Sequence, residues 1–451
     1  MTLSPAELRR RVHQGMARAQ SDLERLVRIP SIAFEGYPRA PLDEAAGAAA
    51  DILAACGLRG VRLLDIPDGP HAVFGELPAP PDRPTVLLYS HYDVQPPGDE
   101  TLWTSPPFEP VVRDGRLYGR GASDDKAGVI MHAAALRAIG GELGVGVKVL
   151  IEGEEETGSG SLDAWVEANQ TQVSSDLIVM GDAGNVRLGT PTLTISLRGM
   201  VAAVVEVETL ATAVHSGMFG GAAPDALMAL VRMLDSLLDA DGNVAVEGLK
   251  TIEWDGGDYP EADFRADATV LDGVDLIGDG TVGQRVWARP SITAIGLDAP
   301  PVDSAGNAIV PRARAKVSVR LAPGQDPDQA RAALRAHLER CTPWQAKVMV
   351  TDAGSGEGFL AETSGPGYQI VEAAWSEAFG APIAYAGHGG SIPLVMTFRR
   401  AVPGAEIVLY GPEEPLCRIH SPNESVSLDE LERCILAEAL VLLGMSGRGR
   451  S

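Results

Sequence analysis

The stretch VKVLIEGEEETGSG, Val147 to Gly160, begins with an apolar run and ends in glutamates, at Glu152 and at Glu154 to Glu156. The apolar run predicts a buried strand of a parallel sheet, because such strands are covered on both faces. Carboxylates placed this close together repel one another. The glutamate cluster therefore lies either in open solvent or beside a strongly positive group.

Strands and helices alternate on both sides of this stretch. TVLLY (85–89) and DLIVM (176–180) are predicted strands, and helices are predicted over 126–139 and 162–168. After residue 359 the pattern returns with a helix at 368–379, the strand EIVLYG (406–411) and a final helix. Capping boxes at Ser4 and Ser427 predict where the first and last helices begin, and another helix fits 42–56. The alternation indicates an α/β fold with a mainly parallel sheet sandwiched by helices.

Residues 189–358 follow a different pattern. TPTLTISLRG, AAVVEVETL and ARAKVSVRLAP alternate like antiparallel strands, and helices fit 223–238 and 326–341. This combination is typical of an α+β domain. We therefore predict one α/β domain formed by residues 1–188 and 359–451, interrupted by an inserted α+β domain at 189–358.

Composition excludes some partners. The formal net charge of -24 argues against nucleic acid and against an anionic membrane, since both bind cationic surfaces. The four cysteines form no CxxC pair, the N-terminal segment lacks the apolar core of a signal peptide, and no apolar run is long enough to cross a bilayer. A cytoplasmic protein is the expectation.

Four polar stretches each follow the carboxyl end of a predicted strand. A fifth polar stretch begins a predicted helix after a loop that contains glycine. In such sheets ligands bind beyond the carboxyl ends of the strands, so these side chains should converge. They are His91 and Asp93, Glu154 to Glu156, Asp182, His420, and Asp124 with Asp125. Each stretch alone is most simply a turn, a solvated acidic loop or a helix N-cap. Together they indicate a metal site of zinc or manganese type.

Charge counting favours a pair of ions over one. Carboxylates at Asp124, Glu156 and Asp182, with one bridging hydroxide, carry four negative charges. Two divalent cations balance that charge, and a pair bridged by one carboxylate is an established hydrolytic arrangement.

The motifs SHYDVQPPG, GRGASDDKAG, EGEEETGS, MGDAGN and IHSPNE, in this order, resemble those of the two-metal amidohydrolases. That family includes cytosolic dipeptidases, carnosinases, bacterial glutamate carboxypeptidases and N-acyl amino acid deacylases. HSGMFGG (215–221) and GGSIP (389–393) are most similar to the dipeptidase and carnosinase branch. The resemblance implies a metallo-exopeptidase catalytic domain with an inserted lid and dimerisation domain.

The resemblance also implies roles for the converging residues. One metal would be held by His91, Asp124 and Asp182, and the other by Asp124, Glu156 and His420. Zn²⁺ is the expected ion, with Mn²⁺ or Co²⁺ as alternatives. Asp93 would orient His91, and Glu155 would be the general base. Extended backbone would point Glu155 and Glu156 in opposite directions. A cis peptide is expected between Asp124 and Asp125.

Further residues are assigned by the same resemblance. His215 would stabilise the oxyanion in the neighbouring subunit of a homodimer, and Arg320 would bind the substrate carboxylate. Ser391 would contact substrate. Asn307 or Ala308 stands where the dipeptidases have a threonine that contacts substrate, and Asn307 is the candidate substrate-binding residue there. His388 stands where arginine or an acidic residue is expected, so substrate preference should differ at that position.

The implied reaction is hydrolysis of the amide bond of a dipeptide or short peptide with a free C-terminal carboxylate. A bridging water would be the nucleophile and Glu155 the base. The alternative is an N-acyl amino acid deacylase or desuccinylase using the same metals. A binding protein built on an inactive hydrolase scaffold would lack a ligand or the base, and neither is missing here. The sequence has no GxSxG elbow and no P-loop, and no GxGxxG follows a predicted strand, so no motif supports a serine hydrolase or a nucleotide enzyme.

Overall fold

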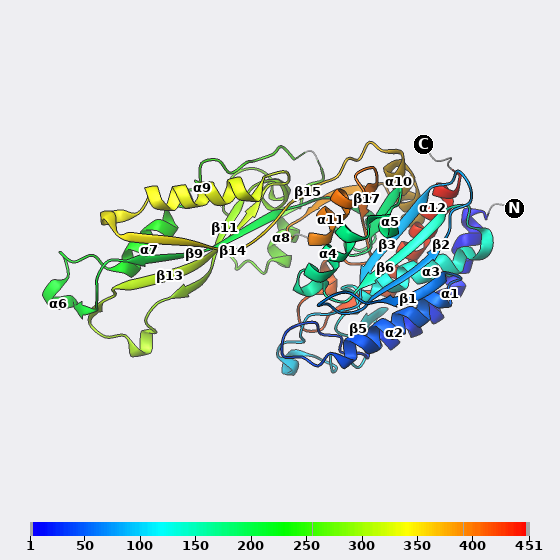
Figure 1. The fold of residues 1–451 in the computed structure, drawn as a ribbon, viewed down its shortest axis with the longest axis horizontal. Helices are drawn as coiled ribbons and strands as arrows, with labels where there is room; N and C mark the ends of the chain where they lie inside the picture. The colour runs from blue at the N-terminus through cyan, green and yellow to red at the C-terminus, as the bar shows by residue number, and fades with distance from the viewer. Residues whose placement is uncertain (1–2, 255, 391, 448–451) are drawn as a thin grey trace. The chain divides into compact units, whose positions relative to one another are not determined.

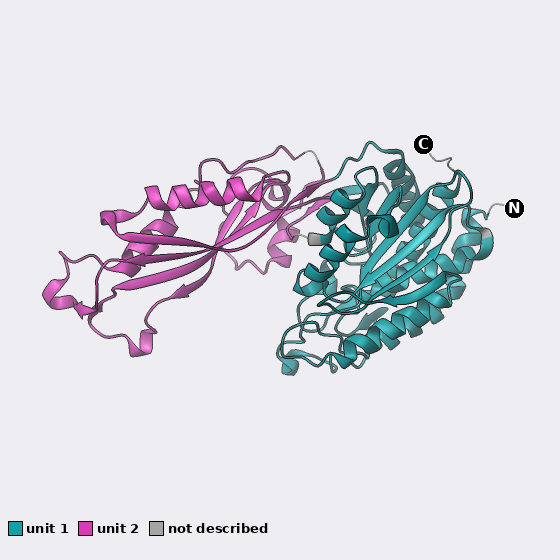
Figure 2. Ribbon diagram, in the orientation of Figure 1, with its two compact units in different colours: residues 1–195, 361–385, 392–451 teal, residues 196–360, 386–391 magenta. Residues whose placement is uncertain are grey.

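The structure is a computed structural model that describes residues 3–254, 256–390 and 392–447. The chain divides into two compact units (Figure 2). Unit 1 comprises residues 1–195, 361–385 and 392–451, and unit 2 comprises 196–360 and 386–391. For comparison, the sequence placed the inserted segment at 189–358.

Unit 1 is built on a mixed sheet whose central strands are parallel (Figure 1). Its strands follow the spatial order β1 (Arg59–Leu64), β2 (Ala72–Leu77), β6 (Gly146–Glu152), β3 (Thr85–His91), β7 (Leu177–Met180), β17 (Glu406–Leu409) and β8 (Thr192–Leu197). The neighbours from β6 to β17 pair in parallel, and the outer pairs are antiparallel. The mainly parallel α/β sheet predicted from the sequence is confirmed.

Helices cover both faces of this sheet. One group shares a continuous core with Val86 and Leu88 of β3, and consists of α1 (Pro5–Val27), α2 (Ala40–Ala54), α3 (Lys126–Ile139), α10 (Pro366–Phe379) and α12 (Leu428–Ser446). The alternate residue Tyr89 instead meets Phe398, at 5.9 Å between ring centroids. Phe398 lies on α11 (Pro393–Ala401), which packs with α4 (Gly160–Ala168) and α5 (Gln170–Val173). Burial on both faces explains the unbroken apolar runs.

Both predicted capping boxes form only in part. Ser4 and Ser427 accept hydrogen bonds from the backbone N–H of the third helical residue, at 3.2 and 3.3 Å. The glutamates do not reach back to the caps. Glu7 binds Arg10 and Arg11, and Glu430 accepts from Asn185 and from the N–H of Gly189. In each case the glutamate binds a charged or buried donor in place of the backbone N–H of the N-cap residue.

Unit 2 is an antiparallel sheet covered on one face by helices, which confirms its predicted α+β character. The strand order is β11 (Ser291–Asp298), β13 (Arg312–Leu321), β9 (Gly199–Glu208), β14 (Lys347–Gly356). Helices α7 (Ala226–Asp235) and α9 (Pro327–Arg340) pack on it around a separate core. Strand β13 alternates between buried and exposed side chains, as a sheet with one covered face requires.

The segments that enter and leave unit 2 run side by side. Leu197 pairs with Phe359 of β15 (Phe359–Leu360). Gly199 and Gly358 come so close that a Cβ on either would lie 2.9 or 2.7 Å from the backbone nitrogen of the other. Glycine is therefore required at both positions.

A separate three-stranded sheet is formed by short strands of unit 1. Strands β4 (Val111–Arg113), β5 (Arg116–Tyr118) and β18 (Ser425–Ser427) form a small sheet. Among the described helices, none has the length and apolar character needed to cross a bilayer.

Candidate metal centre

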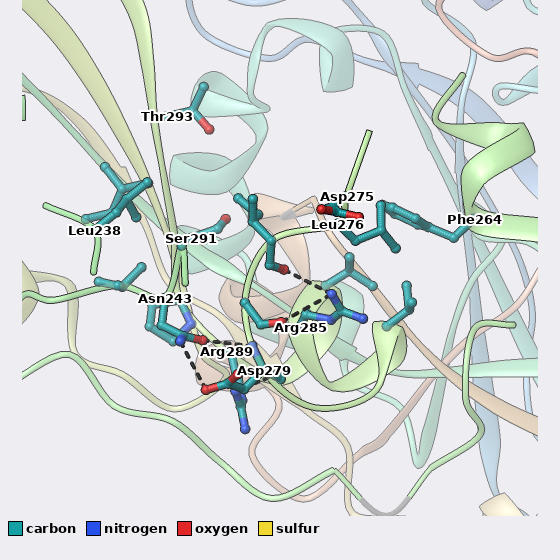
Figure 3. Close-up of a pocket in the computed structure, with 18 of the residues that line it drawn as sticks. Leu238, Asn243, Phe264, Asp275, Leu276, Asp279, Arg285, Arg289, Ser291 and Thr293 are labelled. Carbon is teal, nitrogen blue, oxygen red and sulfur yellow. Dashed lines mark hydrogen bonds between the residues drawn. The ribbon is translucent and has the colours of Figure 1, made fainter. Parts of the chain in front are cut away.

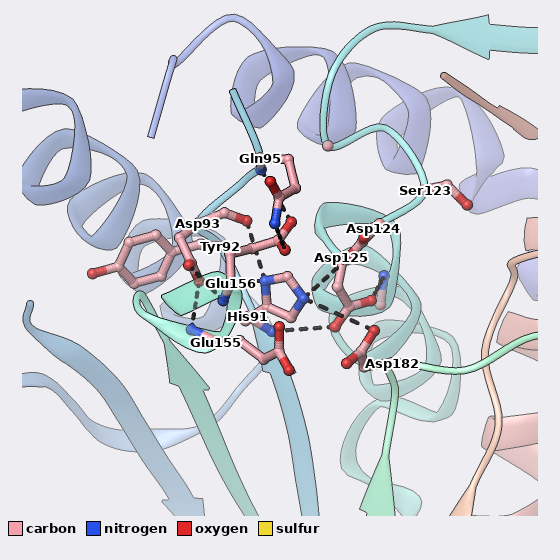
Figure 4. A network of polar contacts seen from close by, with 12 residues as sticks. His91, Tyr92, Asp93, Gln95, Ser123, Asp124, Asp125, Glu155, Glu156 and Asp182 are labelled. Atoms are coloured by element: carbon pink, nitrogen blue, oxygen red, sulfur yellow. Dashed lines mark hydrogen bonds and ion pairs between the residues drawn. The ribbon is translucent and has the colours of Figure 1, made fainter. Parts of the chain in front are cut away.

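The predicted polar residues of unit 1 gather at the carboxyl edge of the parallel strands (Figure 4). His91 is the last residue of β3, and Asp182 follows β7 by two residues. The glutamates follow β6 in a single 3-10 turn, Glu155–Thr157. Parallel strands end at one edge of a sheet, so residues far apart in the sequence meet there.

Asp124 stands between two imidazoles. Its Oδ1 lies 3.1 Å from Nε2 of His91, and its Oδ2 lies 2.9 Å from Nε2 of His420. Asp182 Oδ1 is 3.9 Å from the same atom of His91, and Glu156 Oε2 is 3.3 Å from that of His420. The two oxygens of one carboxylate thus face two separate ligand sets, which is the arrangement of a bridging ligand.

Asp93 holds two parts of this centre in place: the His91 ring and the turn that carries Glu155 and Glu156. Its backbone carbonyl and Oδ1 lie 3.1 and 3.3 Å from Nδ1 of His91. Its two carboxylate oxygens accept the backbone N–H groups of Glu155 and Glu156, each at 3.1 Å. One buried carboxylate therefore fixes both the His91 ring, whose Nε2 is directed at Asp124, and the turn that carries the glutamates.

The extended backbone predicted for Glu155 and Glu156 is wrong, because they lie in a 3-10 turn. Successive residues of such a turn still diverge, by about 120°. Glu156 accepts from the backbone N–H and side-chain amide of Gln95, at 3.0 and 2.7 Å. Glu154 instead accepts the N–H groups of Ser161 and Leu162 in the first turn of α4, so it is structural.

The loop that carries Asp124 is held in place by hydrogen bonds to Glu424. Its Oε1 accepts the N–H groups of Ser123 and Asp124, and its Oε2 accepts from Arg120 at 2.6 Å. Asp125 is the N-cap of α3 and also accepts the N–H of His91. The expected cis peptide between Asp124 and Asp125 is present.

Burial and charge shift the protonation of the centre. Burial, then the charge of Asp182, raises the pKa of the Glu155 carboxyl well above its usual range. Burial also raises the pKa of Asp182 to about 7, with Asp124 and Glu156 adding to the effect. Hydrogen bonds to Asp124 and Glu156 raise the pKa of His420 to about 11.

These residues fit a pair of divalent ions. Ligand atoms lie within 4.8 Å of one another in three groups: His91, Asp125 and Asp182; Asp124, Glu156 and His420; Asp124, Asp182 and Glu413. Nε2 of His91 is buried and makes no hydrogen bond within the described part of the chain. A buried nitrogen facing carboxylate oxygens is the donor set that zinc or manganese takes.

Sequence reasoning missed three supporting residues: Gln95, Glu424 and Glu413. The first two lie inside motifs that had been recognised, SHYDVQPPG and IHSPNE, where the signal was a polar residue four positions after a ligand histidine. Each acts on a partner far along the chain, so neither role could be inferred from spacing.

The remaining predicted site residues belong to unit 2. His215 ends β10 (Val214–His215) and pairs with Ala308 of β12 (Ala308–Ile309), and the N–H of Ser216 donates to the Asn307 carbonyl at 3.0 Å. His215 and Asn307 are therefore neighbours, both exposed. Arg320 lies on β13, opposite Met200. Ser391 lies outside the described residues. His388 ends β16 (Ala384–His388), and its carbonyl accepts from the N–H of Arg198.

Unit 2 also contains a cavity of about 550 Å³ (Figure 3). Its wall is largely aliphatic and includes Leu238, Leu276 and Ile292. Arg285 and Arg289 also line it, and they donate hydrogen bonds to the backbone carbonyls of Ile277 and Asp279. None of the metal-binding candidates lines it.

An α/β fold in which one carboxylate faces two histidines, each beside a further carboxylate, has the side chains that a two-metal hydrolase requires. The sequence matches the description "Peptidase family M20/M25/M40" over residues 87–443, so the chain belongs to this family and is a metallopeptidase. It is 43% identical to the cysteinylglycine-S-conjugate dipeptidase of Corynebacterium striatum over 80% of this chain and 81% of that one.

Other relatives agree with this placement. The Cys-Gly metallodipeptidase of Schizosaccharomyces pombe is 26% identical, with 90% of this chain and 91% of the relative aligned. Among solved structures, human carnosine dipeptidase 1 superposes with a TM-score of 0.82 at 25% identity, covering 99% of this chain and 100% of that one. The predicted family and its dipeptidase and carnosinase relatives are confirmed.

Proposed function

We propose that this enzyme is a dipeptidase that uses two divalent metal ions, Zn²⁺ in the first instance, to hydrolyse the amide bond of dipeptides with a free C-terminal carboxylate. The observation that carries the proposal is Asp124, whose two oxygens face His91 and His420 at 3.1 and 2.9 Å. The relatives named above act on Cys-Gly conjugates and Cys-Gly, both dipeptides by their names.

His91, Asp124 and Asp182 would hold one ion, and Asp124, Glu156 and His420 the other. When bound, the pair supplies a lowered water pKa and a Lewis acid for the scissile carbonyl. Glu155 takes the proton from the attacking water and delivers it to the leaving amine nitrogen. Its raised pKa makes the carboxylate a stronger base than an exposed glutamate. Arg320 binds the substrate carboxylate as a guanidinium fork.

Glu155→Gln tests the base assignment. The amide keeps the shape of the side chain but cannot accept the proton, so turnover should fall by about 100- to 10,000-fold, the range that a positioned base contributes. Metal content, measured by plasma mass spectrometry, should stay at that of the wild type. Retained turnover with a full metal complement would remove Glu155 from this role.

We further propose a homodimer in which His215 of one subunit serves the metal centre of its partner. His215 is exposed, and its Nδ1 accepts from the N–H of Gly217, which leaves Nε2 directed elsewhere. Chains carrying His215→Ala and chains carrying Glu155→Gln, each inactive alone, should complement when mixed. Random exchange makes half the dimers mixed with one complete site in two, so about a quarter of the wild-type rate is expected. No recovery after subunit exchange confirmed by mass spectrometry would contradict donation between subunits.

A substrate panel separates dipeptidase from deacylase. Metal-loaded protein should release amino acids from dipeptides and β-alanyl dipeptides faster than from acetyl or succinyl amino acids. The reverse ranking would establish the deacylase reading on the same metals.

A further inference from the structure

Glu413 belongs to one of the three candidate metal groups, with Asp124 and Asp182, although it is not among the five ligands assigned above. It follows β17 by four residues, as Gly184 follows β7 by four residues, and the two strands pair in parallel at Leu409 and Met180. The register continues past the strands. Gly184 and Glu413 form a parallel bridge, and the N–H of Asn185 donates to the Glu413 carbonyl at 2.7 Å.

Gly184 allows this close approach. A Cβ at position 184 would lie 2.5 Å from the Glu413 Cβ and 2.6 Å from its carbonyl oxygen. Gly411 is confined in the same way, since a Cβ there would lie 2.3 Å from the Ala183 carbonyl oxygen. Two glycines thus press the segments after β7 and β17 together, and this fixes where the Glu413 side chain begins.

The Glu413 carboxylate points into the centre. One of its oxygens lies within 4.8 Å of ligand oxygens of both Asp124 and Asp182. The residue is only 9% exposed, and its Oε1 is buried with no hydrogen-bond partner in the described residues. Three ionised carboxylates gathered in this way are unfavourable unless they take up a proton or a cation lies among them, and a metal ion would satisfy all three oxygens together.

Other buried glutamates of unit 1 show what a structural role looks like. Glu414 pairs with Arg116 at 2.6 Å and accepts the N–H of Leu416. Glu430 accepts from Asn185 and Gly189, and Glu152 binds Tyr89 and Ser159. Each has donors or a cation. Glu413 is next to Glu414 in the chain and faces only other carboxylates in the groups described.

We propose that Glu413 is a direct ligand of the metal ion held by Asp182, in addition to the ligands assigned above. The inference rests on the proposed two-metal centre. A fourth ligand carboxylate brings the protein charge at the centre to that of two divalent ions before any hydroxide is counted. Glu413 therefore strengthens retention of the metal pair and completes the coordination of the Asp182 ion.

Glu413→Gln tests this in metal-free protein titrated with Zn²⁺ against a chromophoric chelator. One of the two ions should bind at least about 10-fold more weakly, since loss of even a residue that supports a ligand costs about 10–100-fold. The other ion should bind as in the wild type. With Co²⁺, the visible absorption of the weakened site should become more intense, because that intensity grows as the coordination number falls.

The control is Glu430→Gln. Glu430 is a buried glutamate that accepts a hydrogen bond from Asn185, in the segment after β7 that also contacts Glu413, but it belongs to none of the candidate metal groups. It should leave both affinities and the cobalt spectrum unchanged. Gly184→Ala is an independent variant that displaces Glu413 without removing a ligand, and it should weaken the same ion. Because Gly184→Ala leaves every carboxylate in the sequence, the affinity for the Asp182 ion can still be measured if Glu413→Gln does not fold.

The outcomes are distinct. Unchanged affinities in Glu413→Gln overturn the inference, and so does weaker binding with an unchanged cobalt spectrum, since that excludes direct ligation. A wild-type protein that binds fewer than two ions overturns the proposed metal pair itself. Only a weakened single ion with an altered spectrum supports Glu413 as a ligand.

Discussion

At the scale of single residues, the centre depends on carboxylates with more than one task. Asp93 accepts two backbone N–H groups and lies against His91, so one carboxylate holds both the turn that carries Glu155 and the His91 ring. Asp124 faces two histidines. Because neither residue has a spare oxygen, substitution by asparagine at either one would place a donor where donors already converge.

Metal binding should release a proton from His420. In the metal-free protein the pKa of His420 is raised to about 11, so its imidazole is protonated at neutral pH. A metal ligand must be the neutral imidazole, and the ion expels that proton. Affinity should therefore rise with pH below about 11, by up to tenfold per pH unit for each proton displaced. Calorimetry in buffers of different ionisation enthalpy measures the release. A proton count near zero at pH 7 would contradict the assignment of His420.

At the scale of elements, the loop before α3 is built around the buried pair of Glu424 and Arg120. The carboxylate satisfies Arg120 and three backbone N–H groups, of Gly121, Ser123 and Asp124. The loop that presents Asp124 is thus held by a residue just before β18.

Glu424→Ala should therefore destabilise the fold. It leaves the buried Arg120 without a counter-charge, and breaking such a pair costs about 3–5 kcal/mol. Urea unfolding measures the change. Glu377→Ala, which removes an exposed partner of Arg9 at 3.9 Å, should stay within about 0.5 kcal/mol. Equal effects in both variants would show that the Glu424 pair does not hold this loop.

The element scale also shows what the sequence could predict. Apolar runs followed by polar residues located the strands and the edge where ligands converge, because both depend on local patterning. Contacts between distant segments left no such signal. Glu424 and Asp124 are separated by 300 positions, and Gln95 and Glu156 by 61. The turn at Glu155 escaped prediction because the carboxylate that binds its N–H group belongs to Asp93, 62 positions earlier in the chain and two residues beyond the end of β3.

At the scale of the whole molecule, the two units have separate hydrophobic cores. The candidate metal ligands, from His91 to His420, all belong to unit 1. In the absence of ions their carboxylates repel one another, so ion binding should stabilise this unit in particular.

Metal removal should therefore lower the melting temperature of unit 1 selectively. A ligand at 100 times its dissociation constant stabilises the folded state by about 2.7 kcal/mol. Thermal unfolding with and without a chelator, followed by fluorescence in variants that keep only Trp375 in unit 1 or only Trp287 in unit 2, should show the larger shift for unit 1. An equal shift of both transitions would indicate that the units unfold as one.

The close approach of Gly199 and Gly358, where the chain enters and leaves unit 2, has an evolutionary consequence. The main stretch of unit 2 begins and ends at adjacent points, so it is a loop closed on itself, and neighbouring strands are only about 4.8 Å apart. A module of this kind can be acquired, exchanged or lost in one genetic event without rethreading its host. Ancestors lacking it would need only a tight turn to join the flanking strands.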